Sequence, residues 1–337
     1  MATPLRDIPT TIITGFLGVG KTTAITELLR LKPARESWAV LINEFGEVGV
    51  DGALLQGQQG DDSGIHIREV PGGCMCCAAG LPMQVGLNHL LIRARPDRLL
   101  IEPTGLGHPK EVLQVLSDLY RDVLDVQQVL TLVDARQLAD QRYTDNDTFN
   151  QQIAIADCII GNKSDLYQPE DSQRLRDYVQ HHGRTHVSVL LTTRGQLALS
   201  MLDRKADAPP ELDDEQSAHP HHHLAQDETP ILAIDTPLPA SGYLKAENSG
   251  EGHRSVGWRF SSDRLFHHDR LFSFLSGIDA MRLKAVFLTD KGAFGYNLTN
   301  DALSEITLQT CDESRIEIIN KIIDPNWETQ LMQCLIA

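Results

Sequence analysis

A glycine-rich segment, Gly15-Phe-Leu-Gly-Val-Gly20-Lys21-Thr22, constrains this chain more than any other feature. It follows an apolar, β-branched stretch at residues 10–14 and precedes a helical pattern that carries Ile25 and Leu28. A strand, a glycine loop, a Lys-Thr pair and a helix together are typical of a P-loop, whose backbone N–H groups surround phosphate. The alternative is a glycine-rich turn that matches by chance, and the flanking strand and helix disfavour it.

The residues of this loop have two kinds of role toward a nucleotide. Lys21 is expected to reach the β- and γ-phosphates, and the Thr22 hydroxyl is expected to bind Mg²⁺, so both are candidate catalytic residues. Other positions of the loop are expected to bind the cofactor: Gly15, Gly18, Val19, Gly20 and Thr23. A P-loop alone does not distinguish ATP from GTP.

Strand and helix patterns alternate through the first two hundred residues. Apolar runs predict further strands at residues 38–43, 98–102, 129–133 and 157–161. Helical spacing is visible in Met83, Leu87, Leu90 and Leu91, and again in Val112, Val115, Leu116 and Leu119 after Pro109. This alternation predicts an α/β fold with a doubly wound, mostly parallel sheet, which binds ligands at the carboxyl ends of its strands.

The segment Asn162-Lys163-Ser164-Asp165 follows one of these strands and is the candidate base-reading element. The Asp165 carboxylate can accept hydrogen bonds from N1–H and N2–H₂ of guanine, whereas adenine would leave it unpaired. Asn162 is expected to hold the base and the loops together, and the stem of Lys163 is expected to pack along the base. The motif therefore predicts GTP as the nucleotide.

A second strand end carries candidate metal and switch residues. Glu102 ends the apolar run 98–102, and Gly105 follows three residues later. The carboxylate can hold Mg²⁺ through a water, and the Gly105 N–H can sense the γ-phosphate, so both are further candidate catalytic residues. An ordinary turn after a buried strand is the alternative. Asp134, at the end of the next strand, receives no assignment.

Three cysteines lie within four positions: Cys74, Cys76 and Cys77, directly after a pair of glycines. Three thiolates suit Zn²⁺, Cu⁺ or a borderline ion and leave one coordination position open to exchange. A thiol oxidoreductase is the rival hypothesis, because Cys74 and Cys77 form a Cys-x-x-Cys pair.

Composition excludes several classes of protein. The 337 residues suffice for about two domains, and 41% hydrophobic and 23% charged residues are near the averages of folded proteins. A net charge of −16 disfavours nucleic acid as a partner. No apolar run has the length of a membrane span, and the first ten residues lack an apolar signal core, so we expect no membrane contact and a cytoplasmic location.

An acidic segment is predicted to divide the chain. Residues 206–228 contain seven acidic residues, three prolines, four histidines and no Lys or Arg, which is typical of an exposed linker. We therefore expect a P-loop GTPase domain over 1–205, a linker over 206–228 and a smaller α+β domain over 229–337. The second domain is expected to have strands at 284–289, 293–298, 305–310 and 315–320, a strand around Trp258, and helices at 269–278 and from Pro325, with Asp324 as N-cap.

Five segments in this order resemble the CobW-type metallochaperone GTPases: residues 15–22, 43–48, 73–77, 102–105 and 162–165. Within that family, residues 80–88 and 102–109 are similar to the YeiR-type zinc-binding GTPases. The resemblance is close over about residues 1–200 and extends to the C-terminal domain only in general layout.

The resemblance implies slow intrinsic GTP hydrolysis and the delivery of a transition metal, Zn²⁺ first, with Co²⁺ or Ni²⁺ compatible. It places Glu44 and Glu47 in a switch-like loop, either as further metal ligands or as solvated acids. It also likens four residues to the histidine tracts of many members, either as weak metal ligands or as chance residues of a linker: His219, His221, His222 and His223. Besides GTP, GDP and metal, the implied partners are a metalloprotein client at the C-terminal domain and a second copy of the chain.

Two other functions stay open. A nucleotide-dependent zinc sensor or buffer would bind metal without a client and without measurable turnover. A P-loop kinase of a small molecule would need neither the 162–165 segment nor the cysteine loop.

Overall fold

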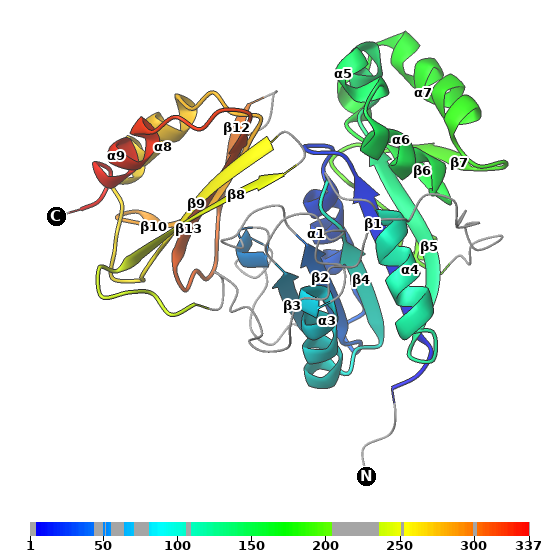
Figure 1. Cartoon of the computed structure of the whole chain (residues 1–337), viewed down its shortest axis with the longest axis horizontal. Helices are drawn as coiled ribbons and strands as arrows, with labels where there is room; N and C mark the ends of the chain where they lie inside the picture. Colours follow the sequence, from blue (N-terminus) through cyan, green and yellow to red (C-terminus); the bar gives the residue numbers. More distant parts are fainter. Residues whose placement is uncertain are drawn as a thin grey trace, which may run out of the picture.

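The computed structural model describes residues 5–43, 50, 52–54, 64–70, 81–105, 109–203, 236–250, 253–298 and 302–336. These residues build two sheets, each with its own helices (Figure 1). Among the helices in these ranges, none is long and apolar enough to cross a membrane.

The first sheet has seven strands in the order β3-β2-β4-β1-β5-β6-β7, and all its strand pairs are parallel. The strands are β1 Ile8–Gly15, β2 Trp38–Asn43, β3 Ile65–Val70, β4 Arg98–Glu102, β5 Leu124–Val133, β6 Cys158–Gly161 and β7 Ser188–Leu191. The doubly wound, parallel architecture predicted from the sequence is thereby confirmed.

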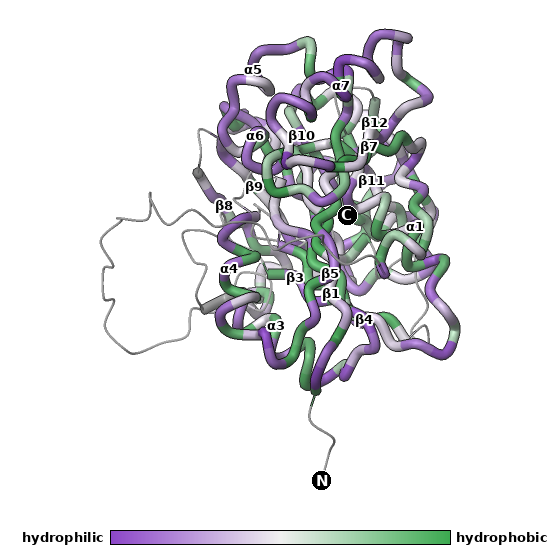
Figure 2. Tube along the Cα trace, turned by 90° about the vertical axis from the view of Figure 1, so that its right-hand side faces the viewer, coloured by the Kyte–Doolittle hydropathy of each residue, from purple (hydrophilic) through white to green (hydrophobic). Residues whose placement is uncertain are grey.

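Helices cover both faces of this sheet, so side chains on both faces of the central strands are buried. One core joins α1 (Lys21–Leu31), α6 (Asp147–Ala154) and α7 (Pro169–His182) to Val40 of β2, whereas α3 (Leu81–Ala94) and α4 (Pro109–Leu119) pack on the other face against Leu41. Figure 2 shows the apolar runs of β1 and β5 at the centre of this domain. The remaining short elements are η1 Ala135–Ala139, α5 Gln141–Thr144, η2 Ser164–Leu166 and η3 Leu199–Met201.

The structure corrects details of the first domain. Strands β3 and β7 were not predicted: β3 carries His66, Arg68 and Glu69 among its apolar residues, and β7 has only four residues. Leu119 was expected on the buried face of α4, but it is 59% exposed, and Leu113 is buried instead.

The second sheet is antiparallel, with the order β12-β11-β10-β13-β9-β8. Its strands are β8 Tyr243–Gly250, β9 His253–Phe260, β10 Arg282–Thr289, β11 Gly292–Leu298, β12 Leu303–Thr307 and β13 Ser314–Asn320. Helices α8 (His268–Ser276) and α9 (Asn326–Met332) cover one face, where Trp258, Phe287 and Leu331 belong to one core. This confirms the smaller α+β domain.

Two predictions for the second domain were wrong in position. Strand β12 covers Leu303–Thr307 instead of 305–310. Helix α9 begins at Asn326 with Pro325 as N-cap, although the Asp324 carboxylate still accepts the Asn326 N–H at 2.9 Å. Strand β8 was not predicted, because its sequence YLKAENSG has too few apolar residues to show alternation.

The face of the second sheet opposite α8 and α9 packs on the first domain (Figure 1). Val286 of β10 and Leu308 share an apolar cluster with Val50 and Leu54. A Cβ added to Gly295 of β11 would lie 2.5 Å from Cδ2 of Leu54, so the sheet approaches this segment closely. The two domains are therefore joined by a buried contact.

Candidate functional site

The glycine loop connects the end of β1 to the first turn of α1. Gly20 directly precedes this helix with φ 99°, a left-handed conformation that favours glycine. A Cβ at this position would also lie 2.5 Å from Nδ2 of Asn162, so only glycine lets the loop approach that side chain. The first turn of α1 contains no acidic residue, which leaves the positive end of the helix available to an anion.

Lys21 and Gly105 lie on the same side of this loop. The Lys21 ammonium is nearly buried and donates a hydrogen bond to the Phe16 carbonyl at 3.2 Å. A Cβ on Gly105 would lie 3.0 Å from Nζ of Lys21 and 3.0 Å from the Leu17 amide nitrogen. The Gly105 carbonyl accepts a hydrogen bond from Nε2 of Gln152 at 3.1 Å, which ties this turn to α6.

Thr22 and Glu102 meet although they are 80 residues apart in the chain. The Thr22 hydroxyl donates to Oε1 of Glu102 at 3.3 Å, and Glu102 is 3% exposed at the end of β4. The same hydroxyl accepts a hydrogen bond from Nζ of Lys284, on β10 of the second domain, at 2.8 Å. Two oxygen groups that suit Mg²⁺ therefore lie together, with a lysine beside them.

Asn162 connects the base-reading segment to the P-loop. Its side chain is 2% exposed, its Nδ2 donates to the Val19 carbonyl at 2.8 Å, and its Oδ1 accepts the Gly195 N–H at 3.0 Å. Gly195 itself has φ 70°, and a Cβ there would lie 2.7 Å from the Ala24 amide nitrogen in α1. One amide side chain thus joins three loops that would surround a nucleotide.

The neighbouring residues of this segment differ in exposure. Lys163 has the left-handed backbone φ 60° and ψ 33°, and its ammonium lies 3.6 Å from Oδ2 of Asp134. Asp134 is 2% exposed and accepts hydrogen bonds from Nε of Arg136 at 2.9 Å and from Nη2 at 2.6 Å. Asp165 lies in η2 and is exposed.

The remaining predicted metal residues lie outside the described residues: Glu44, Glu47, Cys74, Cys76, Cys77, His219, His221, His222 and His223. The strand ends next to two of these segments are described, however. Asn43, at the end of β2, pairs in register with Val70, at the end of β3, and Ile42 pairs with Glu102. The segments that carry Glu44 and Cys74 therefore begin at the same edge of the sheet as Glu102.

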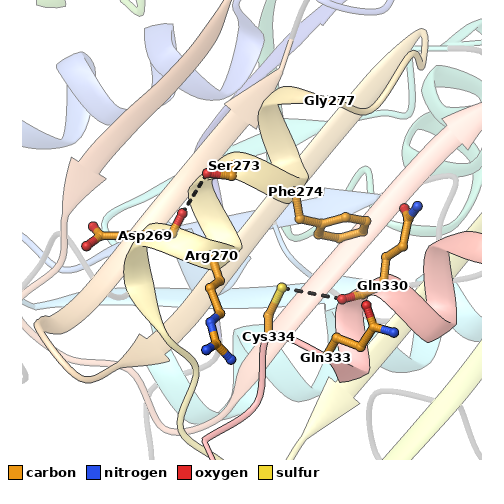
Figure 3. A pocket seen from close by; sticks show the side chains of 8 residues that line it. All are labelled: Asp269, Arg270, Ser273, Phe274, Gly277, Gln330, Gln333 and Cys334. Atoms are coloured by element: carbon orange, nitrogen blue, oxygen red, sulfur yellow. Dashed lines mark hydrogen bonds between the residues drawn. The ribbon is translucent and has the colours of Figure 1, made fainter.

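Elsewhere in the described part of the chain, no group of three or more His, Cys, Asp or Glu is arranged to hold a metal ion. The second domain has a cavity of about 830 Å³ between α8 and α9 (Figure 3). Arg270, Phe274 and Cys334 contribute to its lining, and the Cys334 thiol donates to the Gln330 carbonyl at 3.4 Å. It lies on the helix-covered side of the sheet, away from the face that carries Lys284.

Three residues of this site were missed by sequence reasoning: Lys284, Gly195 and Asp134. Lys284 had a weak signal, because it is one of two charged residues in a mostly apolar central strand. The sequence marks Gly195 only as the glycine of an Arg-Gly pair, which is typical of a turn. Asp134 is recognisable in the sequence only as an acid at a strand end, and its contact with Lys163 depends on the three-dimensional fold.

Comparison with known proteins identifies relatives over most of the chain. Residues 9–189 match the family described as CobW/HypB/UreG, nucleotide-binding domain. The chain is 41% identical over 313 residues to the zinc chaperone YeiR of Escherichia coli (strain K12), covering 92% of each protein. It is 31% identical over 245 residues to the zinc chaperone CobW of Pseudomonas aeruginosa, covering 64% of this chain and 65% of that protein. It is 31% identical over 220 residues to the zinc chaperone CobW of a Sinorhizobium species, covering 58% of this chain and 62% of that protein.

Proposed function

This chain belongs to the CobW/HypB/UreG family, and on that premise we propose that it is a zinc-binding GTPase that couples GTP binding and slow hydrolysis to the binding and delivery of a transition metal. The observation that carries the GTPase part is the meeting of three elements at one sheet edge: the P-loop, the Thr22–Glu102 contact and the Asn162 side chain. The metal part is supported by the relative with 41% identity, which is named a zinc chaperone.

Phosphate would be bound by groups that already face the glycine loop. The backbone N–H groups of α1 and the Lys21 ammonium supply positive charge, and Lys21 would exchange the Phe16 carbonyl for phosphate oxygens. Gly105 lies against both Lys21 and the loop, so its N–H is placed to respond to the terminal phosphate. We assign Lys21, Gly105, Thr22 and Glu102 to the catalytic set.

Thr22 and Glu102 fit a magnesium ion, because their oxygens lie 3.3 Å apart and hard cations prefer oxygen ligands. Thr22 would bind the ion directly, and Glu102 would hold it through a water. When bound, Mg²⁺ neutralises charge on the β- and γ-phosphates. Burial of Glu102 at the end of β4 keeps its carboxylate in position for this role.

The choice of guanine is assigned to Asp165, with Asn162 and Lys163 in support. Asp165 is exposed, so its carboxylate can accept both donors of the guanine edge. The left-handed conformation of Lys163 separates the buried Asn162 from the exposed Asp165 within four residues. Asp134 lies 3.6 Å from the Lys163 ammonium and so helps to orient that side chain.

Zinc is the proposed cargo, and Cys74, Cys76 and Cys77 are its proposed ligands, with Glu44 and Glu47 as further candidates. Three thiolates leave one tetrahedral position open, which suits an ion that must be transferred. The cysteine segment and the Glu44 segment start from paired strand ends beside Glu102, so nucleotide and metal would bind at one edge. The second domain is proposed to contact the metalloprotein client.

Two measurements test this function. Fluorescent GTP and ATP analogues should give selective binding of GTP, and Lys21→Ala should lose binding and slow turnover together because Lys21 meets phosphate in both states. Zinc titration should show one tight site, lost when Cys74, Cys76 and Cys77 are all replaced by serine. Equal use of ATP and GTP would favour a kinase, and tight zinc binding without turnover would favour a buffer.

A further inference from the structure

A lysine from the second domain reaches the nucleotide site of the first. Lys284 is 262 residues from Thr22 in the chain, yet its ammonium donates a hydrogen bond of 2.8 Å to the Thr22 hydroxyl. Its side chain is 9% exposed, so this contact is inside the domain interface. No motif of the P-loop accounts for it.

The second sheet positions Lys284 through its regular alternation. Leu283 and Phe287 of β10 belong to the core under α8 and α9, whereas Lys284 and Val286 lie on the opposite face. Val286 packs in the cluster with Val50 and Leu54 of the first domain. Strand β10, which carries Lys284, lies inside the sheet between β11 and β13. On β13, the residue paired with Lys284 is the buried Glu317.

The contact uses the oxygen atom that Mg²⁺ would need. The Thr22 hydroxyl donates to Glu102 and accepts from Lys284, so its hydrogen-bonding groups face a carboxylate and an ammonium. An ammonium and Mg²⁺ on one oxygen would be close neighbours of like charge in a partly buried place, where repulsion is screened less than in water. Both cations cannot occupy this oxygen favourably.

We propose that Lys284 competes with Mg²⁺ for Thr22, so that binding of the Mg²⁺–nucleotide complex must displace Lys284 and thereby changes the contact between the two domains. This inference rests on the GTPase function proposed above. It makes the second domain part of the nucleotide site, because the domain supplies the cation that Mg²⁺ must replace. The affinity for Mg²⁺ is then set by both domains.

The test is a Mg²⁺ titration of the full chain with a fluorescent GDP analogue bound, which measures binding without hydrolysis. Lys284→Met removes the competing charge and keeps the aliphatic stem, so the Mg²⁺ concentration at half-saturation should fall about tenfold, as expected for one hydrogen bond to a charged group. Lys284→Arg keeps the charge and should stay near the wild type. Lys291→Met is the matched control, because Lys291 lies in the turn between β10 and β11, is 51% exposed and pairs with Asp269 of α8 at 2.6 Å.

Thermal unfolding checks that each variant is folded, and Lys284→Gln serves in place of the Met variant if that variant does not fold. If the Mg²⁺ concentration at half-saturation of the Met and Gln variants stays within about twofold of the wild-type value, the role of Lys284 is overturned, because loss of a hydrogen bond to a charged group should change it about tenfold. An equal decrease in Lys291→Met would overturn it as well, since general charge would then be the cause. Failure of the wild type to bind any guanine nucleotide would overturn the proposed function and this inference with it.

Discussion

Asn162→Ala tests whether one buried amide holds the loops of the nucleotide site together. The substitution removes the donor to the Val19 carbonyl at 2.8 Å and the acceptor of the Gly195 N–H at 3.0 Å. Asn162 is 2% exposed, so bulk water does not reach the groups that lose their partner. Both backbone groups belong to loops around the nucleotide, and the loss therefore affects binding as well as folding.

The magnitude follows from those two bonds. A buried backbone group without its partner costs about 1–3 kcal/mol, so the sum is about 2–6 kcal/mol. Because the smaller alanine side chain lets the surrounding loops relax, we expect the free energy of unfolding to decrease by the lower part of this range, about 2–3 kcal/mol. If about 2 kcal/mol of this loss falls on the nucleotide-binding conformation, GTP affinity decreases about 30-fold, because 1.4 kcal/mol corresponds to tenfold.

Urea unfolding and calorimetric titration with a non-hydrolysable GTP analogue measure the two effects separately. Asn150→Ala is the control, because Asn150 also makes two side-chain hydrogen bonds, which are partly buried: it donates to the Thr144 carbonyl at 2.9 Å and accepts from the Tyr178 hydroxyl. Asn150 lies on α6. The control should lose stability and keep GTP affinity. An Asn162→Ala protein with GTP affinity within about twofold of the wild type, or a control with an equal loss, would refute the reasoning.

Two further predictions concern the base and the thiols. Asp165→Asn should weaken GTP and admit xanthosine triphosphate, because the new amide donor meets the C2 carbonyl of xanthine; competition between the two nucleotides measures this, and unchanged GTP preference would argue against Asp165. In the metal-free protein at about pH 7.5, iodoacetamide should label the three cysteines of the 74–77 segment before Cys311 and Cys334, because the thiolate is the reactive form. Burial raises the pKa of Cys311 to about 11 and also raises the pKa of Cys334, so the labelling of both thiols should accelerate only as the pH rises above neutral toward their raised pKa. Mass spectrometry after a short pulse of iodoacetamide counts the labelled cysteines. Zinc should protect only the three cysteines of the 74–77 segment, and early labelling of Cys311 would contradict the prediction.

Local sequence was sufficient to single out the residues that meet at strand ends. Thr22 and Glu102 are 80 residues apart, but Thr22 comes after the glycine loop that follows one recognisable strand, Glu102 ends another, and parallel strands bring their carboxyl ends to one edge. The meeting of Asn162 with the P-loop follows from the same topology. These contacts depend on the fold class, which the alternating pattern predicts.

Contacts between the domains could not be predicted in this way. Lys284 reaches Thr22 only because β10 lies inside the second sheet with one particular face toward the first domain. Strand alternation shows that Lys284 and Val286 share a face, but it does not show what covers that face. Short or polar edge strands such as β3 and β8 were missed because their pairing, and not their composition, makes them strands.

The central claim is that the nucleotide state controls metal binding, and zinc affinity in three nucleotide states tests it most directly. Asn43, Val70 and Glu102 end neighbouring strands, so GTP bound at this edge should bring the three thiolates of the segment after Val70 into one geometry. At fixed Mg²⁺ and pH, the GTP-analogue form should bind zinc about 5- to 150-fold more tightly than the GDP form, or about 1–3 kcal/mol, and zinc should tighten GTP by the same factor. Equal zinc affinities in the nucleotide-free, GDP and GTP-analogue forms would contradict the account.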